Sequence, residues 1–232
     1  MITWVSTAKE CRFLSTLVDR KRSSTYVDAM GNQALLACGM AAGPLFTVAY
    51  LLEGACRVGY RPFRHPVSSL ALGRAGWAQT ANFFLVGLLS LLFAVGLWRV
   101  GPSRWGALLI GVWAVGLLGA GAFRADPVSG YPPGIPDRLQ RPTRTGALHD
   151  LFSLMGFLAL AVACFAFALS SSPGWTIYSI ASGVLFVTTM ALASAAFDQQ
   201  QRWVDLGGLF QRISLTIGWA WQTLLAVRIL YT

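Results

Sequence analysis

Residues 77–98 read WAQTANFFLVGLLSLLFAVGLW, a stretch without a charged side chain. A helix needs about 20 mostly apolar residues to cross the hydrocarbon core of a bilayer, and this stretch is long enough. Other mostly apolar stretches of sufficient length occupy residues 32–56, 105–123, 148–169, 175–197 and 209–231. The sequence therefore predicts an all-α fold, a polytopic integral membrane bundle of six transmembrane helices.

The composition also favours a membrane protein. Hydrophobic residues make up 55% of the chain and charged residues only 12%, whereas soluble domains carry about 25% charged residues. Because the six stretches use most of the chain, we expect one transmembrane domain at residues 32–232. Residues 1–31 are predicted to form a basic N-terminal tail, either disordered or folded as an interfacial amphipathic helix. Charged residues interrupt any apolar core in this tail, so it does not look like a cleaved signal peptide.

The net charge of +9 favours membrane lipids as partners over nucleic acid, because the basic residues are spread over the tail and the loops. Each basic residue near an anionic surface contributes about 1 kcal/mol of attraction. Most are arginine, whose planar fork suits bidentate binding of phosphate or carboxylate, although a GC-rich genome would also favour arginine codons. Basic residues divide almost evenly between the two membrane faces. The dense cluster before the first helix therefore decides our prediction, which is a cell-membrane protein with a cytoplasmic N-terminus.

With six crossings, the first, third and fifth loops lie on the same side of the membrane. This face holds both histidines and most of the acids. The candidate catalytic residues are Glu53, His65, Asp126, His149 and Asp150. Ionisable groups at the ends of membrane helices are functional hypotheses by default, and these five could supply acid–base chemistry at the level of the lipid head groups.

Structural roles are the alternative for each of these residues. Glu53 can pair with Arg57, one turn on, and end the first helix. Asp150 can meet the dipole at the start of the fourth helix, and Asp126 before a proline fits turn chemistry. The histidines show none of the HxxH, HxH or HExxH spacings of metal sites, so we predict no metal site, and the cofactor is unknown.

Arginine and amide side chains at the same helix ends form the predicted ligand-binding set. These residues are Arg57, Arg64, Asn82, Arg124, Gln211 and Arg212. The arginines would hold a phosphate or carboxylate head group while an apolar tail lies between the helices. The expected ligand class is a membrane lipid or an isoprenoid.

Several motifs resemble a known family. Residues 65–73 read HPVSSLALG, residues 77–83 read WAQTANF, residues 148–150 read LHD and residues 208–212 read GLFQR. With these motifs and the loop at residues 123–134, the chain resembles, over residues 33–231, the prokaryotic six-helix membrane family catalogued as domain of unknown function 998. It is also distantly similar to the autophagy-modulator membrane proteins. The resemblance implies the fold and the topology, and it implies no reaction.

Three functions stay open at this point. The protein could be a membrane enzyme acting on a lipid or isoprenoid head group. It could be a non-catalytic binder or transporter of a lipid or small anion, with the proline-rich third loop as a lid. It could also be a scaffold whose polar loops only close the bundle. None of these functions specifies an oligomeric state.

Overall fold

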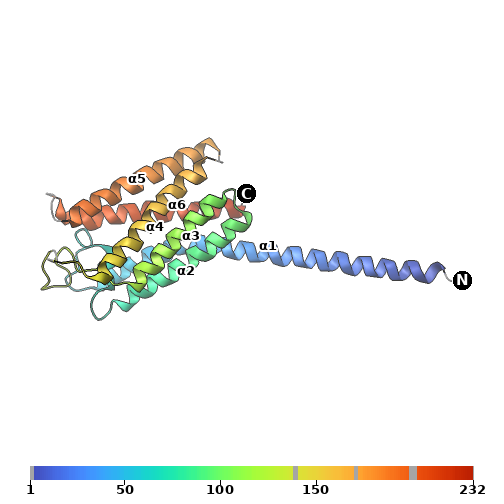
Figure 1. Cartoon of the computed structure of the whole chain (residues 1–232), viewed down its shortest axis with the longest axis horizontal. Helices are drawn as coiled ribbons and strands as arrows, with labels where there is room; N and C mark the ends of the chain where they lie inside the picture. Colours follow the sequence, from blue (N-terminus) through green and yellow to red (C-terminus); the bar gives the residue numbers. More distant parts are fainter. Residues whose placement is uncertain (1–2, 138–140, 170–171, 199–202, 232) are drawn as a thin grey trace.

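A computed structural model describes residues 3–137, 141–169, 172–198 and 203–231, with side chains from Ala29 onward. Six α-helices follow one another along the chain (Figure 1). They are α1 (Thr3–Cys56), α2 (Trp77–Val100), α3 (Arg104–Ala122), α4 (Arg144–Ala168), α5 (Pro173–Phe197) and α6 (Gly207–Tyr231). Two short 3-10 helices, η1 (Val67–Ala71) and η2 (Val204–Leu206), precede α2 and α6.

Each helix holds a segment long and apolar enough to cross a membrane, which confirms the six predicted stretches and the bundle. The segments are Ala29–Cys56, Trp77–Val100, Arg104–Ala122, Arg144–Ala168, Pro173–Phe197 and Val204–Tyr231. The fourth segment starts one turn before the predicted residue 148. The reason is an N-cap: the Thr143 hydroxyl accepts a hydrogen bond from the Gly146 amide at 3.0 Å. Such a cap stabilises a polar first turn of the helix, and a hydropathy pattern does not predict a turn made of polar residues.

The α1 helix begins at Thr3, so its backbone runs on from the first span and extends beyond the bundle (Figure 1). The side chains before Ala29 lie outside the described residues. The boundary at residue 31, and the choice between a disordered tail and an interfacial helix, therefore stay predictions.

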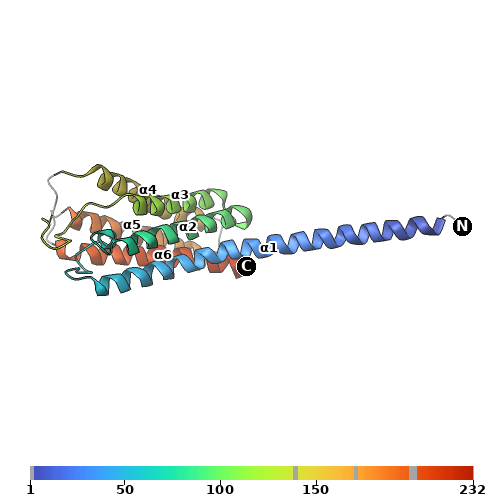
Figure 2. The ribbon, with the colours of Figure 1, turned by 90° about the horizontal axis from the view of Figure 1, so that it is seen from below.

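Helices that are neighbours in the sequence are also neighbours in space. Each packs on the next from α1 to α6, and α6 packs back on α1, so the six helices close into a ring. Figure 2 shows the same bundle from a second direction, with α1 and α6 side by side. The short connections between α2 and α3 and between α4 and α5 make these pairs antiparallel neighbours, because they leave no room to cross the bundle. The interior of the ring is filled by large aromatic side chains, among them Phe46, Phe93, Phe186 and Trp221.

Glycines allow the tightest contacts in the ring. A Cβ atom on Gly116 of α3 would lie 2.7 Å from the Cα of Gly156 in α4 and 2.8 Å from the Phe152 carbonyl oxygen. In a membrane, where the lipid is as apolar as the side chains, small residues let helices approach and gain van der Waals contact. The α3–α4 pair depends on this approach.

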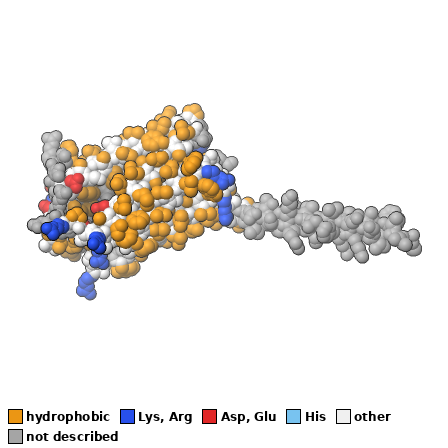
Figure 3. Space-filling model, in the orientation of Figure 1, with side chains coloured by type: hydrophobic (Ala, Val, Ile, Leu, Met, Phe, Trp, Pro, Cys, Tyr) orange, Lys and Arg blue, Asp and Glu red, His pale blue; other side chains and the backbone are white. Residues whose placement is uncertain are grey.

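The flank of the bundle is apolar, and the charged side chains of this view gather at its two ends (Figure 3). Trp77 at the start of α2 and Trp105 at the start of α3 are 73% and 76% exposed. Tryptophan favours the head-group level of a bilayer. Their positions at opposite ends of the bundle therefore agree with a membrane that lies between them.

Candidate functional site

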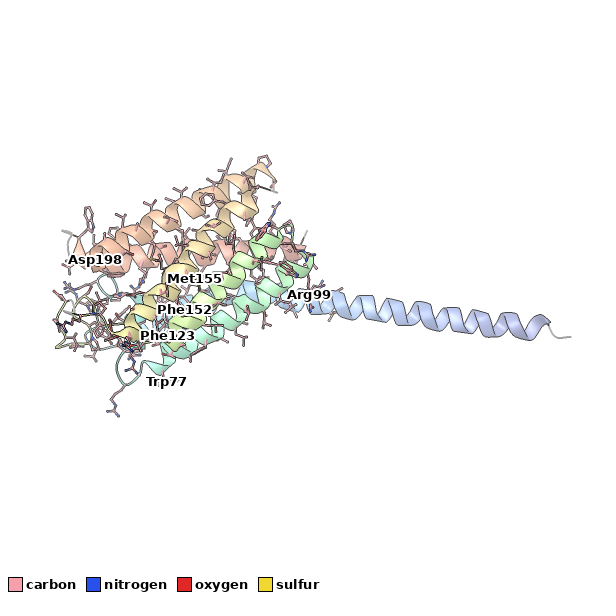
Figure 4. All side chains as sticks on the ribbon, in the orientation of Figure 1. Trp77, Arg99, Phe123, Phe152, Met155 and Asp198 are labelled. Carbon is pink, nitrogen blue, oxygen red and sulfur yellow. The ribbon has the colours of Figure 1, made fainter. Side chains whose placement is uncertain are left out.

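The first, third and fifth connections lie together at one end of the bundle (Figure 1), as the number of crossings predicts. We call their described residues, 57–76, 123–137, 141–143, 198 and 203–206, the loop layer. Figure 4 places Trp77, Phe123 and Asp198 at this end and Arg99 at the opposite end. Every residue of the predicted site lies in the loop layer or in the helix turns beside it.

Arg64 joins all three connections of the loop layer. Its guanidinium lies 2.8 Å from the Asp137 carboxylate and 2.6 Å from the Asp205 carboxylate, and its Nε donates to the Ser129 carbonyl oxygen at 3.0 Å. Burial alone would lower the pKa of Arg64, but its bonds to the two carboxylates raise it above the ordinary arginine value. Arg64 therefore stays charged, and its fork is occupied by protein groups.

Two neighbouring side chains of α6 bind the first connection. Arg212 donates to the carbonyl oxygens of Pro62 and His65 and to the Tyr60 hydroxyl. The Gln211 side-chain oxygen accepts from the Val67 amide at 2.7 Å. Burial raises the pKa of Tyr60, and the Arg212 charge only partly opposes this shift, so the hydroxyl stays protonated.

Glu53 and Arg57 form an ion pair at 3.1 Å at the end of α1. Arg57 also donates to the carbonyl oxygens of Leu70, Leu72 and Ala75, at the end of η1 and before α2. Glu53 accepts a hydrogen bond from the backbone of Gln79 in the first turn of α2. The pair therefore ends the first helix, as the structural alternative predicted, and in addition fastens it to the start of the second.

His65 is 3% exposed and packs between two tyrosine rings, with centroid distances of 5.5 Å to Tyr60 and 5.2 Å to Tyr131. Its Nδ1 accepts a hydrogen bond from the Arg61 amide at 2.9 Å, so the neutral ring carries its proton on Nε2. Burial, together with the positive charge of Arg64, lowers the pKa of His65 from 6.5 to about 4. The imidazole is therefore neutral over most of the physiological range.

This lowered pKa predicts that the loop layer loses stability in acid. Between pH 6.5 and about 4, the unfolded chain binds a proton at His65 and the folded chain does not, so the free energy of unfolding falls as the pH falls. The contribution is fully present above pH 6.5. We expect thermal unfolding of the purified protein from pH 7 to pH 4 to show this loss, and a H65N variant to show less of it. An identical pH dependence in H65N would contradict the assignment, because the carboxylates titrate equally in both proteins.

Asp126 and His149 hold the two ends of the third connection. The Asp126 carboxylate accepts from the amide and the hydroxyl of Thr143, at 2.8 and 2.6 Å, and so caps the start of α4. The His149 Nδ1 lies 3.0 Å from the carbonyl oxygens of Ala120 and Phe123. Because both neighbours are acceptors, this nitrogen carries the proton and donates to carbonyls that the end of α3 leaves free.

Asn82 lies inside the bundle, 7% exposed, and donates to the Phe46 carbonyl oxygen and to the Gln79 side chain, each at 3.3 Å. Asp150 is exposed one turn after Gly146 and interacts electrostatically with His149 and Asp126. In the part of the chain that the structure describes, no hydrogen bond joins one of the five catalytic candidates to another. Their predicted role in chemistry stays a prediction.

A shallow pocket of about 380 Å³ opens beside Arg124 in the loop layer. Prolines of the third connection and Ile135 form an apolar wall, and Arg124, Asp126, Thr143 and Thr145 form a polar one. Arg124 is exposed, and among the described residues no hydrogen bond or ion pair occupies its guanidinium. The pocket thus combines an available cation with hydroxyl groups. Three His, Cys, Asp or Glu side chains close enough to share a metal ion do not occur in the described ranges.

Sequence reasoning missed the residues that complete the loop layer. These are Tyr60, Tyr131, Asp137, Thr143, Thr145 and Asp205. Asp137 and Asp205 carried a signal, since they are acids in connections of the same face and Arg64 needed counter-charges. Nothing in the sequence says which arginine each acid meets, because Arg64 lies 73 and 141 residues from them.

Comparison with known proteins gives one family. The family model described as "Protein of unknown function (DUF998)" matches residues 40–228. No curated protein and no solved structure matches the chain.

Proposed function

Because the chain belongs to the DUF998 family, whose description assigns no function, we propose from the site alone that it is a non-catalytic membrane receptor for an anionic head group. The ligand would be the phosphate or carboxylate head of a lipid or isoprenoid. Arg124 would bind its charge, and the Thr145 hydroxyl would donate a hydrogen bond, because the Thr143 hydroxyl already donates to Asp126.

The availability of Arg124 carries the proposal. Arg57, Arg64 and Arg212 already donate to carbonyls or carboxylates of the protein. Arg124 instead lines an open pocket with its guanidinium exposed. A charged donor beside a pocket forms a charge-assisted hydrogen bond with an anion. Such a bond is stronger than one from water or from a neutral group.

The acid–base candidates are already hydrogen-bonded or ion-paired to protein groups, which favours a ligand-binding function over a catalytic one. Both carboxylate oxygens of Asp126, the acid in this pocket, accept from Thr143. A general base must reach the proton that it removes, and Asp126 would have to break the cap of α4 to do so. Glu53, His65 and His149 are similarly held by protein partners.

In nanodiscs, we expect native mass spectrometry to detect phosphatidic acid bound to the wild type, and R124Q to bind it about 10-fold more weakly. Loss of a charge-assisted hydrogen bond of about 1.5–3 kcal/mol accounts for such a factor. R61Q and R99Q are matched controls, because they remove the same charge from an exposed arginine in the loop layer and at the opposite end. Both should retain the lipid.

Binding by R124Q equal to that of the wild type would contradict the proposal and favour a scaffold. Conversion of the lipid or of an isoprenoid phosphate by the wild type would contradict its non-catalytic part.

The proposal also includes the cell membrane and a cytoplasmic N-terminus, which put the pocket outside the cell. Cys56, exposed at the loop-layer end of α1, should then react with an impermeant maleimide in intact cells. A Cys56 that does not react would indicate the opposite orientation, with the loop layer inside the cell.

A further inference from the structure

We propose that the interior of the bundle binds a file of ordered water molecules between α1, α2 and α6, running from the loop layer to the middle of the helices. The file would follow a set of buried polar side chains that we call the polar row: Gln79, Asn82, Ser90, Trp113, Trp219 and Gln222. None of these takes part in the proposed head-group site.

Direct contacts connect the polar row from one end to the other. Gln79 and Asn82 are joined at 3.3 Å, and Asn82 donates to the backbone of Phe46. The Phe46 ring lies 5.3 Å from that of Trp219, which lies 5.3 Å from the ring of Trp113. These contacts lead from the first turn of α2 into the centre of the ring.

The inner end of the row is a hydrogen-bonded cluster. The Trp113 indole donates to the Gln222 side-chain oxygen at 3.1 Å, and the Gln222 nitrogen donates to the Ser90 hydroxyl at 3.2 Å. Ser90 lies on the same face of α2 as Gln79 and Asn82, because the intervals between them are three and eight residues. Further along this face the fully buried Phe93 and Leu97 follow, so the polar row ends inside the bundle at apolar side chains and does not reach the opposite end.

Three polar atoms carry the inference, two in the polar row and the third in Thr223, one turn beyond Trp219 on the same face of α6. The Gln79 Nε2, the Trp219 Nε1 and the Thr223 hydroxyl are buried, and none has a hydrogen-bond partner within the described residues. Gln79 is 0% and Trp219 3% exposed. Lipid offers no hydrogen bonds, and a buried donor left unpaired loses the bonds that it makes in water. A ligand that supplies acceptors therefore belongs beside these groups.

Water is the ligand class that fits them. The polar row contains no charged side chain, which disfavours an ion. Buried waters make about three hydrogen bonds each to groups that the protein leaves unpaired. The Ser69 hydroxyl gives the row its outer end, because it is 0% exposed, lacks a partner among the described residues and lies in η1, which packs on α2.

Trp221 provides an internal control in the same helix. It is 0% exposed, but its Nε1 donates to the Ser179 hydroxyl at 3.0 Å. Trp219 and Trp221 are therefore two buried tryptophans of α6 that differ in whether a described residue accepts a hydrogen bond from the indole N–H. Only Trp219 should have water beside it.

X-ray hydroxyl-radical footprinting of the full chain in nanodiscs tests the proposal, because radicals form from bound water and oxidise the side chains next to it. We expect Trp219 to be oxidised at least 5-fold faster than Trp221. In Q79L, which removes the first amide of the polar row, the Trp219 rate should fall at least 2-fold while the Trp221 rate stays unchanged.

Equal, slow oxidation of Trp219 and Trp221 in the wild type would overturn the proposal. So would a Trp219 rate that Q79L leaves unchanged in the folded variant. If Q79L does not fold, the comparison of the two tryptophans in the wild type still decides the question.

Discussion

Replacement of Gly116 by alanine is expected to destabilise the bundle by about 3 kcal/mol, at the upper end of the cost of an added methyl group in a packed core. The new Cβ would lie 2.7 Å from the Gly156 Cα and 2.8 Å from the Phe152 carbonyl oxygen. Both neighbours are backbone atoms, so neither can move aside by changing a rotamer. The helices α3 and α4 would have to separate, and the ring of six helices would open at this contact.

The matched control is Gly111 in the same helix. A Cβ there first meets the Ala94 Cβ at 3.9 Å, an ordinary van der Waals contact. Alanine is a better helix former than glycine by up to about 1 kcal/mol, so G111A should be neutral or stabilising. The free energy of unfolding of the detergent-solubilised variants, measured by circular dichroism during titration with SDS, distinguishes the two. A G116A variant as stable as G111A would show that the α3–α4 approach is not tight.

Replacement of Arg212 by methionine is expected to cost about 2–4 kcal/mol of stability, an effect comparable with that of G116A. The change removes the donors to the carbonyl oxygens of Pro62 and His65 and to the Tyr60 hydroxyl. It also removes a cation whose carbon lies 5.6 Å from the centroids of the Tyr50 and Tyr60 rings. Lysine should rescue only in part, because an ammonium group cannot reproduce the planar fork.

R61M is the control for Arg212. Arg61 lies in the same connection with an exposed side chain, and its hydrogen bonds to Arg64 and His65 come from its backbone, which the substitution keeps. The same unfolding titration should show R61M within about 0.5 kcal/mol of the wild type, as for most surface substitutions. Limited proteolysis in the native state should cut the connection between α1 and α2 faster in R212M only. Equal stability of R212M and R61M would mean that Arg212 does not fasten this connection.

The features of the fold that the sequence predicted are those that follow from hydropathy. An apolar stretch such as residues 77–98 has one low-energy state in a membrane, a spanning helix whose backbone bonds close within the segment. Counting six such stretches also places the odd connections on one face, so the location of Glu53, His65 and Asp126 at that face followed from parity alone. The start of α4 did not follow, because it depends on a cap by Thr143 and Asp126 rather than on hydropathy.

The role of individual charges could not be predicted in the same way. Arg64 and Arg124 both occur in connections of the loop layer, each one or two residues before an ionisable group. The structure gives Arg64 two carboxylates and a carbonyl oxygen, and leaves Arg124 exposed beside a pocket. Sequence spacing carries no information on contacts across 73 or 141 residues, so both residues were equal candidates for a ligand.

By itself, the sequence of this protein determined the features that depend on the hydrophobicity of each segment. The number of helices, their approximate ends and the face that carries the polar residues depend on local composition, since the cost of placing polar groups in hydrocarbon acts on each segment separately. Tertiary structure alone decided which helices touch and which polar groups are satisfied. The Gly116–Gly156 contact, the neutral His65 and the Trp219 indole, unpaired among the described residues, each depend on atoms brought together from distant segments. Such packing is specific to the folded ring.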